Sequence, residues 1–114
     1  MAFADLNAIS GVSNVEMIAC AEIDPARQDR FARKFPKAKR YTDWRELLDK
    51  EAKNFDTANV STPDHMHAPI AMSAMQLGKH VYVQKPLSHD VFESRKLREY
   101  AAANKLVTQM GIQV

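Results

Sequence analysis

Two short turns hold the residue types in this sequence that are best suited to chemistry. Each turn follows a short apolar run, and their residues are Ser61, Thr62 and Pro63 in the first and Gln84, Lys85 and Pro86 in the second. A rigid proline beside small hydroxyl residues lets a backbone approach a ligand closely. A lysine in a partly desolvated cleft can donate to a hydroxyl group and help to move its proton. The pattern favours a ligand site in which Lys85 is the strongest single candidate.

Strands and a helix must place these two turns. Residues 55–60 predict a buried strand and residues 80–83 a second one. Between them a helix is expected to begin between His65 and Pro69, with Pro69 the favoured start, and to stop at Gly78. A strand, a helix and a strand within about thirty residues form a parallel βαβ unit. Ligands bind beyond the carboxyl ends of such strands, where both turns are expected to lie.

The rest of the chain continues the alternation of helices and strands. Further helices are expected at Ala2–Ser10, from Pro25 to Pro36 behind an Asp24 cap, after a capping box of Asp43 and Glu46, and from a Ser88 cap to near Asn104. Further strands are expected at Val15–Ile23, Lys39–Tyr41 and Leu106–Gln109. The run Val15–Ile23 is nearly continuously apolar, which suits a strand covered on both faces. The predicted fold class is α/β, a doubly wound parallel sheet with helices on both faces.

Size and composition limit the classes of protein that fit. The 114 residues suffice for one domain with a core, and 46% apolar and 26% charged residues are ordinary for a globular protein. A net charge of +2 with dispersed basic residues argues against nucleic-acid binding. No apolar run matches a membrane span and no signal peptide is visible, so a cytoplasmic location is expected. The single cysteine, Cys20, is expected to be a buried, inert thiol.

The histidines include a His65-x-His67 pair, which raises the question of a zinc site. Zinc needs three or four protein ligands, and no Cys or Asp partner has suitable spacing. The sequence therefore predicts no metal. His80 is expected at the entry of a strand and His89 in the first turn of a helix, neither with a visible chemical role.

The stretch from Asn59 to Ser88 resembles a known family. It reads TPDHMH, an Ala-rich helix, GKHVYV and then QKPL. In this it is similar to the N-terminal NAD(P)-binding Rossmann domain of the Gfo/Idh/MocA oxidoreductases, and the resemblance extends from about Asn14 to Gln113. The family signature is Glu-Lys-Pro, and Gln84 stands in place of the glutamate, which we interpret as a subgroup trait. A neutral amide there cannot tune the lysine as a carboxylate would.

The resemblance implies a reaction and a cofactor. The reaction would be hydride transfer between NAD, with NADP as the alternative, and a hydroxyl carbon of a sugar, cyclitol or glycoside. Lys85 would be the catalytic residue, and its acid or base partner would lie outside this chain. The residues implied to bind the cofactor are Ser61, Thr62, Pro63, His67, Gln84, Lys85 and Pro86, with Gln109 a further candidate near the nicotinamide.

Glu22 is the candidate for recognising the adenosine ribose. It ends the predicted strand Val15–Ile23, where a dinucleotide-binding domain places an acid that accepts from both ribose hydroxyls. A carboxylate there repels a 2′-phosphate, which favours NAD. Arg27 lies close enough in the sequence to bind a 2′-phosphate, which keeps NADP open. The alternative for Glu22 is an ordinary solvated strand end.

The glycines of a phosphate-binding turn are missing from the sequence. A Rossmann domain opens with a strand and a Gly-x-Gly-x-x-Gly turn, whereas Gly11, Gly78 and Gly111 are the only glycines here. Residues 1–114 are therefore expected to be a partial dinucleotide-binding Rossmann domain that lacks its first strand, with the substrate domain absent. Such a chain is expected to be inactive alone, because the required contacts are not preorganised, and marginally stable or self-associating. A homo-oligomer is thus left open.

A second class of function stays open beside the oxidoreductase. The alternative is a non-enzymatic α/β module that binds a nucleotide weakly or serves as a protein-interaction domain. In that case Lys85 is a lysine at a sheet edge with its ammonium in water, and 61–63 is an ordinary strand-to-helix turn. Saturable NADH binding that depends on Lys85 and Glu22 would separate the two classes.

Overall fold

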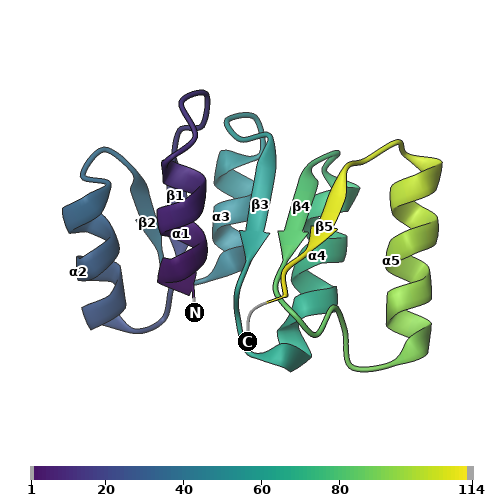
Figure 1. The fold of residues 1–114 in the computed structure, drawn as a ribbon. Coiled ribbons are helices and arrows are strands. Elements are labelled where there is room, and N and C mark those ends of the chain that lie inside the picture. The colour runs from purple at the N-terminus through teal and green to yellow at the C-terminus, as the bar shows by residue number, and fades with distance from the viewer. Residues whose placement is uncertain (1, 113–114) are drawn as a thin grey trace. The chain divides into compact units, whose positions relative to one another are not determined.

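The computed structural model describes residues 2–112, which belong to two compact units (Figure 1). The N-terminal unit comprises Phe3–Phe55, and the C-terminal unit begins at Asp56. The first elements are α1 (Ala2–Ser10), β1 (Ala19–Ala21), α2 (Pro25–Lys34), β2 (Lys39–Tyr41) and α3 (Trp44–Glu51). They are followed by β3 (Thr57–Val60), η1 (Asp64–Met66), α4 (His67–Gln76), β4 (His80–Val83), α5 (Val91–Ala103) and β5 (Thr108–Met110).

The N-terminal unit is built on a two-stranded parallel ladder. β1 pairs with β2 from Ala19↔Lys39 to Ala21↔Tyr41, and α3 packs on both strands. The strand predicted at Val15–Ile23 is therefore right in place but wrong in length, and β1 is half-buried instead of covered on both faces. A ladder extends only as far as its partner strand, and β2 has three residues.

Two aspartates begin the helices of this unit as the sequence predicts. Asp24 before α2 and Asp43 before α3 each accept a hydrogen bond from the backbone N–H two residues later, both at 2.9 Å. Pro25 is the first residue of α2, where its missing N–H has no cost. The capping box is only half formed, because the Glu46 carboxylate pairs with Lys50 at 2.7 Å.

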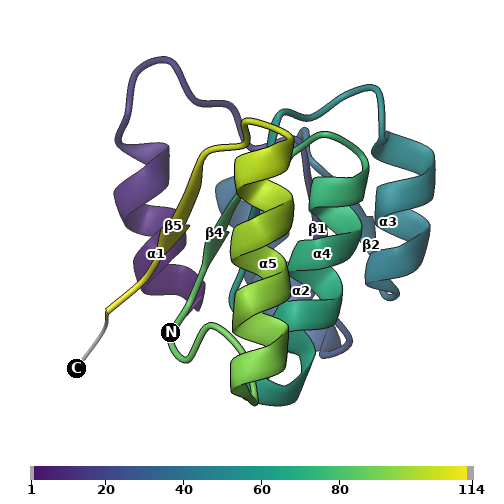
Figure 2. The ribbon, with the colours of Figure 1, turned by 90° about the vertical axis from the view of Figure 1, so that its right-hand side faces the viewer.

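The C-terminal unit has a three-stranded parallel sheet in the order β3-β4-β5. α4 packs on β3 and β4, and α5 lies beside α4 (Figure 2). Buried apolar side chains fill the space between the helices and the sheet, and they are Val60, Ala68, Ile70, Ala71, Ala74, Met75, Val81, Val83, Leu97 and Ala101. The predicted α/β class with parallel strands is confirmed.

The start of α4 differs from the favoured prediction. The helix begins at His67, directly after the 3-10 turn, so Pro69 is its third residue and not its first. The first N–H groups of a helix have no partner within the helix, so a proline is tolerated throughout the first turn. The predicted stop is confirmed, since α4 ends before Gly78, which has a φ of 80°.

The start of α5 also differs from the prediction. Asp90 caps the helix by accepting from the Glu93 backbone N–H at 2.8 Å, and His89 precedes the helix. Ser88, the predicted cap, instead donates to the Asp90 carbonyl at 2.7 Å and shares a hydrogen bond of 2.6 Å with Ser94. A carboxylate at the cap interacts with the positive end of the helix, which a hydroxyl cannot match. Across residues 2–112, every helix falls short of the length and hydropathy needed to cross a membrane.

Candidate functional site

The two candidate turns leave neighbouring strands at the same edge of the sheet. Val60 and Val83 end β3 and β4 and are partners in the parallel ladder. The next bond in the ladder, from the Gln84 N–H to the Val60 carbonyl at 2.9 Å, holds the two chains together where the turns begin. The residues of the two turns are therefore brought together as the βαβ pattern predicts.

The buried side chain of His67 connects the two turns. It is 1% exposed, and both ring nitrogens face backbone carbonyl oxygens. Nδ1 lies 2.6 Å from the Pro86 oxygen and Nε2 lies 2.7 Å from the Thr62 oxygen. With both nitrogens occupied, the ring supports the turns and presents no free polar atom to a ligand.

Lys85 stands at the open edge of this arrangement. Its side chain is exposed, so the partly desolvated cleft expected from the sequence is not formed by the described residues. Within residues 2–112 its ammonium is held by no ion pair, while its backbone N–H donates to Gln84 Oε1 at 3.0 Å. The Lys85–Pro86 peptide bond is cis. The ammonium is thus accessible beyond the carboxyl end of β4.

Gln84 is buried beneath the turn that carries Lys85. Its side chain is 1% exposed, and a methyl group added at Gly111 would lie 2.7 and 2.8 Å from its amide nitrogen and oxygen and 2.8 Å from the Tyr82 hydroxyl. Gly111 also donates its backbone N–H to the Val83 carbonyl at 2.8 Å. The need for a glycine at position 111 could not be predicted from the sequence, because the contact joins residues far apart in the chain.

The hydroxyl turn after β3 is partly exposed. Ser61 Oγ donates to Asn59 Oδ1 at 3.2 Å, whereas the Thr62 hydroxyl has a long contact of 3.5 Å to the Pro63 carbonyl. Pro63 is exposed and precedes the 3-10 turn. Among the described residues, the Thr62 hydroxyl has only this long contact, so it is free to turn toward a ligand.

Glu22 lies in the N-terminal unit, at the carboxyl end of β1. Its Oε1 accepts from the Asp24 backbone N–H at 3.0 Å, and the side chain is partly exposed. Arg27 is exposed and pairs with Asp24 at 3.6 Å. The second carboxylate oxygen of Glu22 has no described partner within residues 2–112, so it can accept further hydrogen bonds.

Gln28 has a role near Glu22 that the sequence analysis missed. Its Nε2 donates to the carbonyl of Glu22 at 2.6 Å and to that of Tyr41 at 3.0 Å, which ties the ends of β1 and β2 together. Gln28 lies three residues before Phe31, the buried residue of α2, so it shares the inward side of the helix. A polar residue on an otherwise apolar helix face was the available signal.

Cys20 in β1 is half-buried, not fully buried as predicted. Burial, and after it the Glu22 carboxylate, raise the pKa of the Cys20 thiol to about 11. The thiol is therefore protonated at neutral pH and unreactive, as predicted for an inert cysteine.

The other polar candidates have local partners. Gln109 donates to the carbonyl of the adjacent Met110 at 3.0 Å and is exposed. His80 Nδ1 accepts from the Val107 N–H at 3.0 Å, which fastens the start of β4 to the segment before β5. His65 and His89 face each other at 6.4 Å between ring centroids. Among residues 2–112, no three His, Cys, Asp or Glu side chains are placed to hold a metal ion.

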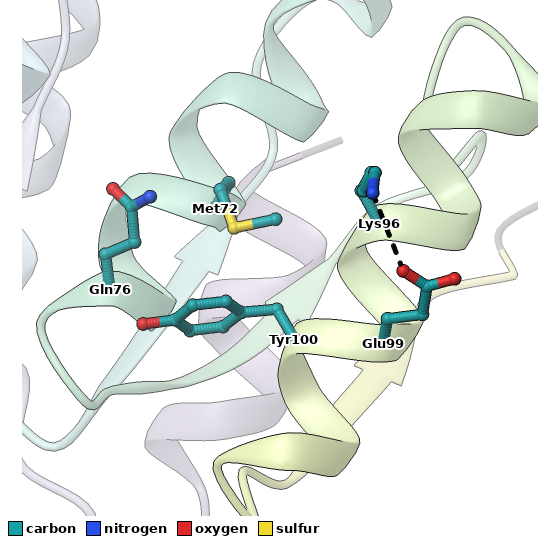
Figure 3. Close-up of a pocket in the computed structure, with 5 residues that line it drawn as sticks. All are labelled: Met72, Gln76, Lys96, Glu99 and Tyr100. Carbon is teal, nitrogen blue, oxygen red and sulfur yellow. Dashed lines mark ion pairs between the residues drawn. The ribbon is translucent and has the colours of Figure 1, made fainter.

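An open groove between α4 and α5 lies apart from the two turns. Its volume is about 410 Å³, and its lining residues are Met72, Gln76, Lys96, Glu99 and Tyr100 (Figure 3). Gln76 is nine residues after His67, or about 13 Å along the helix at 1.5 Å per residue. The Lys96–Glu99 pair at 3.8 Å is exposed. The groove therefore belongs to the helix layer and not to the strand ends.

Comparison with known proteins identifies the family. The profile of the oxidoreductase family with an NAD-binding Rossmann fold, Gfo/Idh/MocA, matches residues 3–112. Levoglucosan dehydrogenase from Pseudarthrobacter phenanthrenivorans is 32% identical over 90 residues, which are 79% of this chain and 22% of that protein. Inositol 2-dehydrogenase from Salmonella paratyphi B is 28% identical over 102 residues, which are 88% of this chain and 30% of that protein.

A solved structure supports the same fold. Biliverdin reductase from Synechocystis sp. PCC 6803, in complex with biliverdin and NADP+, superposes with a TM-score of 0.82 at 22% identity, over 91% of this chain and 32% of that one. The chain thus spans less than a third of the length of each of these three proteins. On the match to nearly all of its residues, the chain belongs to the Gfo/Idh/MocA family of oxidoreductases, whose NAD-binding Rossmann fold takes a nicotinamide dinucleotide as cofactor.

Proposed function

We propose that this chain supplies the nicotinamide-dinucleotide-binding part of an oxidoreductase that acts on a hydroxyl group of a sugar, cyclitol or glycoside. The single observation that carries the proposal is the pairing of Val60 with Val83, which brings the turns at 61–63 and 84–86 to one edge of a parallel sheet. Ligands of α/β proteins bind at this edge. Levoglucosan dehydrogenase and inositol 2-dehydrogenase are relatives whose names support a sugar or cyclitol substrate.

Lys85 is the proposed catalytic residue. Its ammonium is exposed at the carboxyl end of β4, with no ion pair within residues 2–112 to compete for it. It would bind the oxygen of the substrate hydroxyl and take part in moving its proton, while the nicotinamide, when bound, accepts or gives the hydride. Pro86 and the buried Gln84 amide hold the Lys85 backbone in place. Closure of the surroundings by substrate would supply the desolvation that the described residues do not.

Glu22 is the proposed ribose residue. Oε1 is engaged by the Asp24 N–H, which orients the carboxylate and leaves Oε2 to accept from the ribose hydroxyls. A negative charge there disfavours the 2′-phosphate of NADP, so we propose NAD as the preferred cofactor. Arg27 keeps NADP as the alternative, although Asp24 already pairs with it.

The turn Ser61–Thr62–Pro63 is the proposed contact for the middle of the dinucleotide. Its partly exposed hydroxyls and exposed proline fit a backbone that a ligand approaches closely. The described glycines do not add a phosphate-binding turn: a φ of 80° places Gly78 in the turn between α4 and β4, and Gly111 packs against Gln84. We therefore propose that the 114 residues alone bind the cofactor weakly and do not turn over a substrate.

The test is a fluorescence titration of the chain with NADH and with NADPH. Saturable NADH binding is expected, and Glu22→Gln should weaken it about tenfold, since a hydrogen bond to a charged group contributes about 1.5–3 kcal/mol. The same variant should reduce the difference between the affinities for NADH and for NADPH. Lys85→Met should weaken NADH binding by a smaller factor, because its main contact is with the substrate.

Matched controls separate these effects from general charge changes. Glu16→Gln and Lys53→Met remove one exposed charge of each sign at positions outside the proposed site, and they should leave NADH binding unchanged. If wild-type chain shows no saturable NADH binding, or if the controls weaken it as much as the site variants, the proposal is wrong. The non-enzymatic protein-interaction module is then the better assignment.

A further inference from the structure

We propose that Gln28 is a positioning residue for the choice between NAD and NADP, and that it acts through Glu22. Its side-chain amide, carried in the first turns of α2, binds the Glu22 backbone and so helps to fix the direction in which the Glu22 carboxylate leaves the end of β1. This role rests on the proposed function, because Glu22 is the proposed ribose residue. Gln28 needs no contact of its own with the cofactor.

The Gln28 amide nitrogen donates two hydrogen bonds at the strand ends. Nε2 lies 2.6 Å from the Glu22 carbonyl oxygen and 3.0 Å from the Tyr41 carbonyl oxygen. A carbonyl oxygen only accepts hydrogen bonds, and a primary amide nitrogen has two hydrogens to donate. The two contacts therefore use both hydrogens and assign the nitrogen, not the amide oxygen, to this position. They are independent of pH, because an amide does not titrate.

The start of α2 holds Gln28 in place for these bonds. The Gln28 backbone N–H donates to the Asp24 carbonyl at 3.0 Å, and the Asp24 side chain caps the helix through the Ala26 N–H at 2.9 Å. Three residues after Gln28, the side chain of Phe31 is buried, so this side of the helix faces inward. Helix and strand ends belong to the same unit, and together they direct the amide toward β1 and β2.

Glu22 is held at three points, and Gln28 supplies one of them. The Glu22 N–H donates to the Tyr41 carbonyl at 2.9 Å, and Glu22 Oε1 accepts from the Asp24 N–H at 3.0 Å. Those two partners are backbone groups that any residue type would supply, whereas the bond from Gln28 to the Glu22 carbonyl depends on a side chain. Loss of the amide would therefore remove one of the three points that orient the carboxylate and leave the strand pairing in place.

The neutral amide of Gln28 provides these hydrogen bonds without compensating the charge of Glu22. The arginines of this region pair with other carboxylates, Arg27 with Asp24 at 3.6 Å and Arg40 with Asp29 at 3.4 Å. A lysine or arginine at position 28 would offer donors as well, but its charge would attract a 2′-phosphate. With glutamine there, the oriented carboxylate can accept from the ribose hydroxyls and repel a 2′-phosphate.

NMR of the unmodified chain tests the geometry without any ligand. The two Nε2 hydrogens of Gln28 are expected to exchange with water more slowly than those of Gln76, an exposed glutamine in α4. Couplings across the hydrogen bonds should connect Gln28 Nε2 to the carbonyl carbons of Glu22 and Tyr41. Exchange as fast as that of Gln76, without such couplings, would overturn the proposal. Because this measurement uses unmodified chain, it remains decisive if a variant fails to fold.

Variants then test the positioning role by titration with NADH and with NADPH. Gln28→Met keeps the length of the side chain and removes both hydrogens, and it should weaken NADH binding about fivefold. NADPH binding should change less than about twofold, because a less well oriented carboxylate also repels the 2′-phosphate less well. A loss of stability alone would weaken the binding of both cofactors equally. Gln76→Met is the matched control and should leave both affinities unchanged.

A double-mutant cycle shows whether Gln28 acts through Glu22. Gln28→Met combined with Glu22→Gln should weaken NADH binding about tenfold, no more than Glu22→Gln alone, whereas independent effects would multiply to about fiftyfold. Multiplied effects, or an equal loss of affinity for NADH and NADPH in Gln28→Met, would overturn the role of Gln28.

The outcomes separate this role from the proposed function. Saturable NADH binding that Gln28→Met leaves unchanged in a folded chain would reject the role of Gln28 and retain the cofactor site. Absence of saturable NADH binding by the unmodified chain would reject the cofactor site, and the role of Gln28 with it.

Discussion

The two units of the chain bury their side chains in different ways. In the N-terminal unit, the buried apolar side chains among the described residues are Phe31 and Leu48, and the carboxyl groups of Asp5 and Glu51 belong to buried residues as well. The C-terminal unit has a continuous apolar core, and its buried polar side chains, His67 and Gln84, bind backbone groups at the strand ends. The buried part of the N-terminal unit therefore includes charged side chains, whereas that of the C-terminal unit consists mainly of apolar side chains.

Glu51 is the centre of the polar network in the N-terminal unit. It accepts from the Tyr41 hydroxyl and the Asn54 amide, both at 2.9 Å, and pairs with Lys39 at 3.4 Å. The Asn54 and Tyr41 hydrogen bonds, with the Lys39 charge, lower the pKa of Glu51. Burial, and then the bond to Glu51, raise the pKa of Tyr41. The network joins β2 to α3. An ionised carboxylate therefore holds these two elements together, whereas apolar contacts do so in the C-terminal unit.

The largest effect is expected from a cavity in the C-terminal core. Met75 is 1% exposed, and Met75→Ala should lower the free energy of unfolding by about 2–5 kcal/mol. Hydrogen exchange should rise across residues 56–112 and less across 3–55, because the lost contacts lie in the C-terminal unit. Met72→Ala, in the open groove, should cost less than about 1 kcal/mol. Equal losses for the two variants would show that the C-terminal unit does not depend on its buried apolar core more than on its open groove.

A smaller effect is expected where a side chain is added beside the candidate site. Gly111→Ala would place a methyl group 2.7 Å from the Gln84 amide, and it should lower stability by about 1–3 kcal/mol through overpacking. Lys85 should also become more mobile, because its backbone N–H is bound to Gln84, which NMR relaxation can measure. Gly11→Ala, whose added methyl group is at least 3.5 Å from its neighbours, is the control. A similar melting temperature for both variants would show that the Gln84 amide can move away from the added methyl group without a loss of stability.

The smallest effect is expected from neutralising Glu51, and it should depend on pH. Because the folded pKa lies below the usual value of 4.5, the stabilisation is complete above that value and is lost as the pH falls through the folded pKa. Glu51→Gln should therefore cost about 1–2 kcal/mol at neutral pH and progressively less in acid, as urea unfolding can measure. Glu46→Gln, which alters an exposed pair with Lys50, should cost less than about 0.5 kcal/mol. A cost for Glu51→Gln that stays constant from neutral pH into acid would contradict the charged network.

The sequence predicted the strands and most helix ends because these depend on neighbouring residues. Asp24 and Asp43 begin helices, Gly78 follows the end of one, and the strands at 39–41 and 80–83 have the predicted bounds. The start of α5 and the extent of Val15–Ile23 were wrong, whereas α4 begins at His67, inside the predicted range of His65 to Pro69 but not at the favoured Pro69. At the starts of α4 and α5, two candidate start residues lie close together in the sequence. The length of β1 was set by its partner strand, β2.

In the candidate site, too, some residues were found from the sequence and others were missed. The turns at 61–63 and 84–86 and the acid at Glu22 were located from the sequence, since residue type and position after an apolar run suffice to find them. Whether these residues bind the cofactor stays a prediction. Gln28 and Gly111 were missed, because the partner of each is brought near by strand pairing and not by spacing along the chain.

The sequence by itself determined the alternation of helices and strands, the family and the two turns where chemistry is expected, because short-range signals and motifs encode them. Only the tertiary structure decided which side chains of the candidate site are exposed at the strand ends and which are buried behind them. It placed His67 and Gln84 inside and Lys85 outside. The physical reason is that burial and hydrogen-bond partners depend on strand register and helix packing, which bring together residues far apart in the chain, as in the bond from Val107 to His80, 27 positions away.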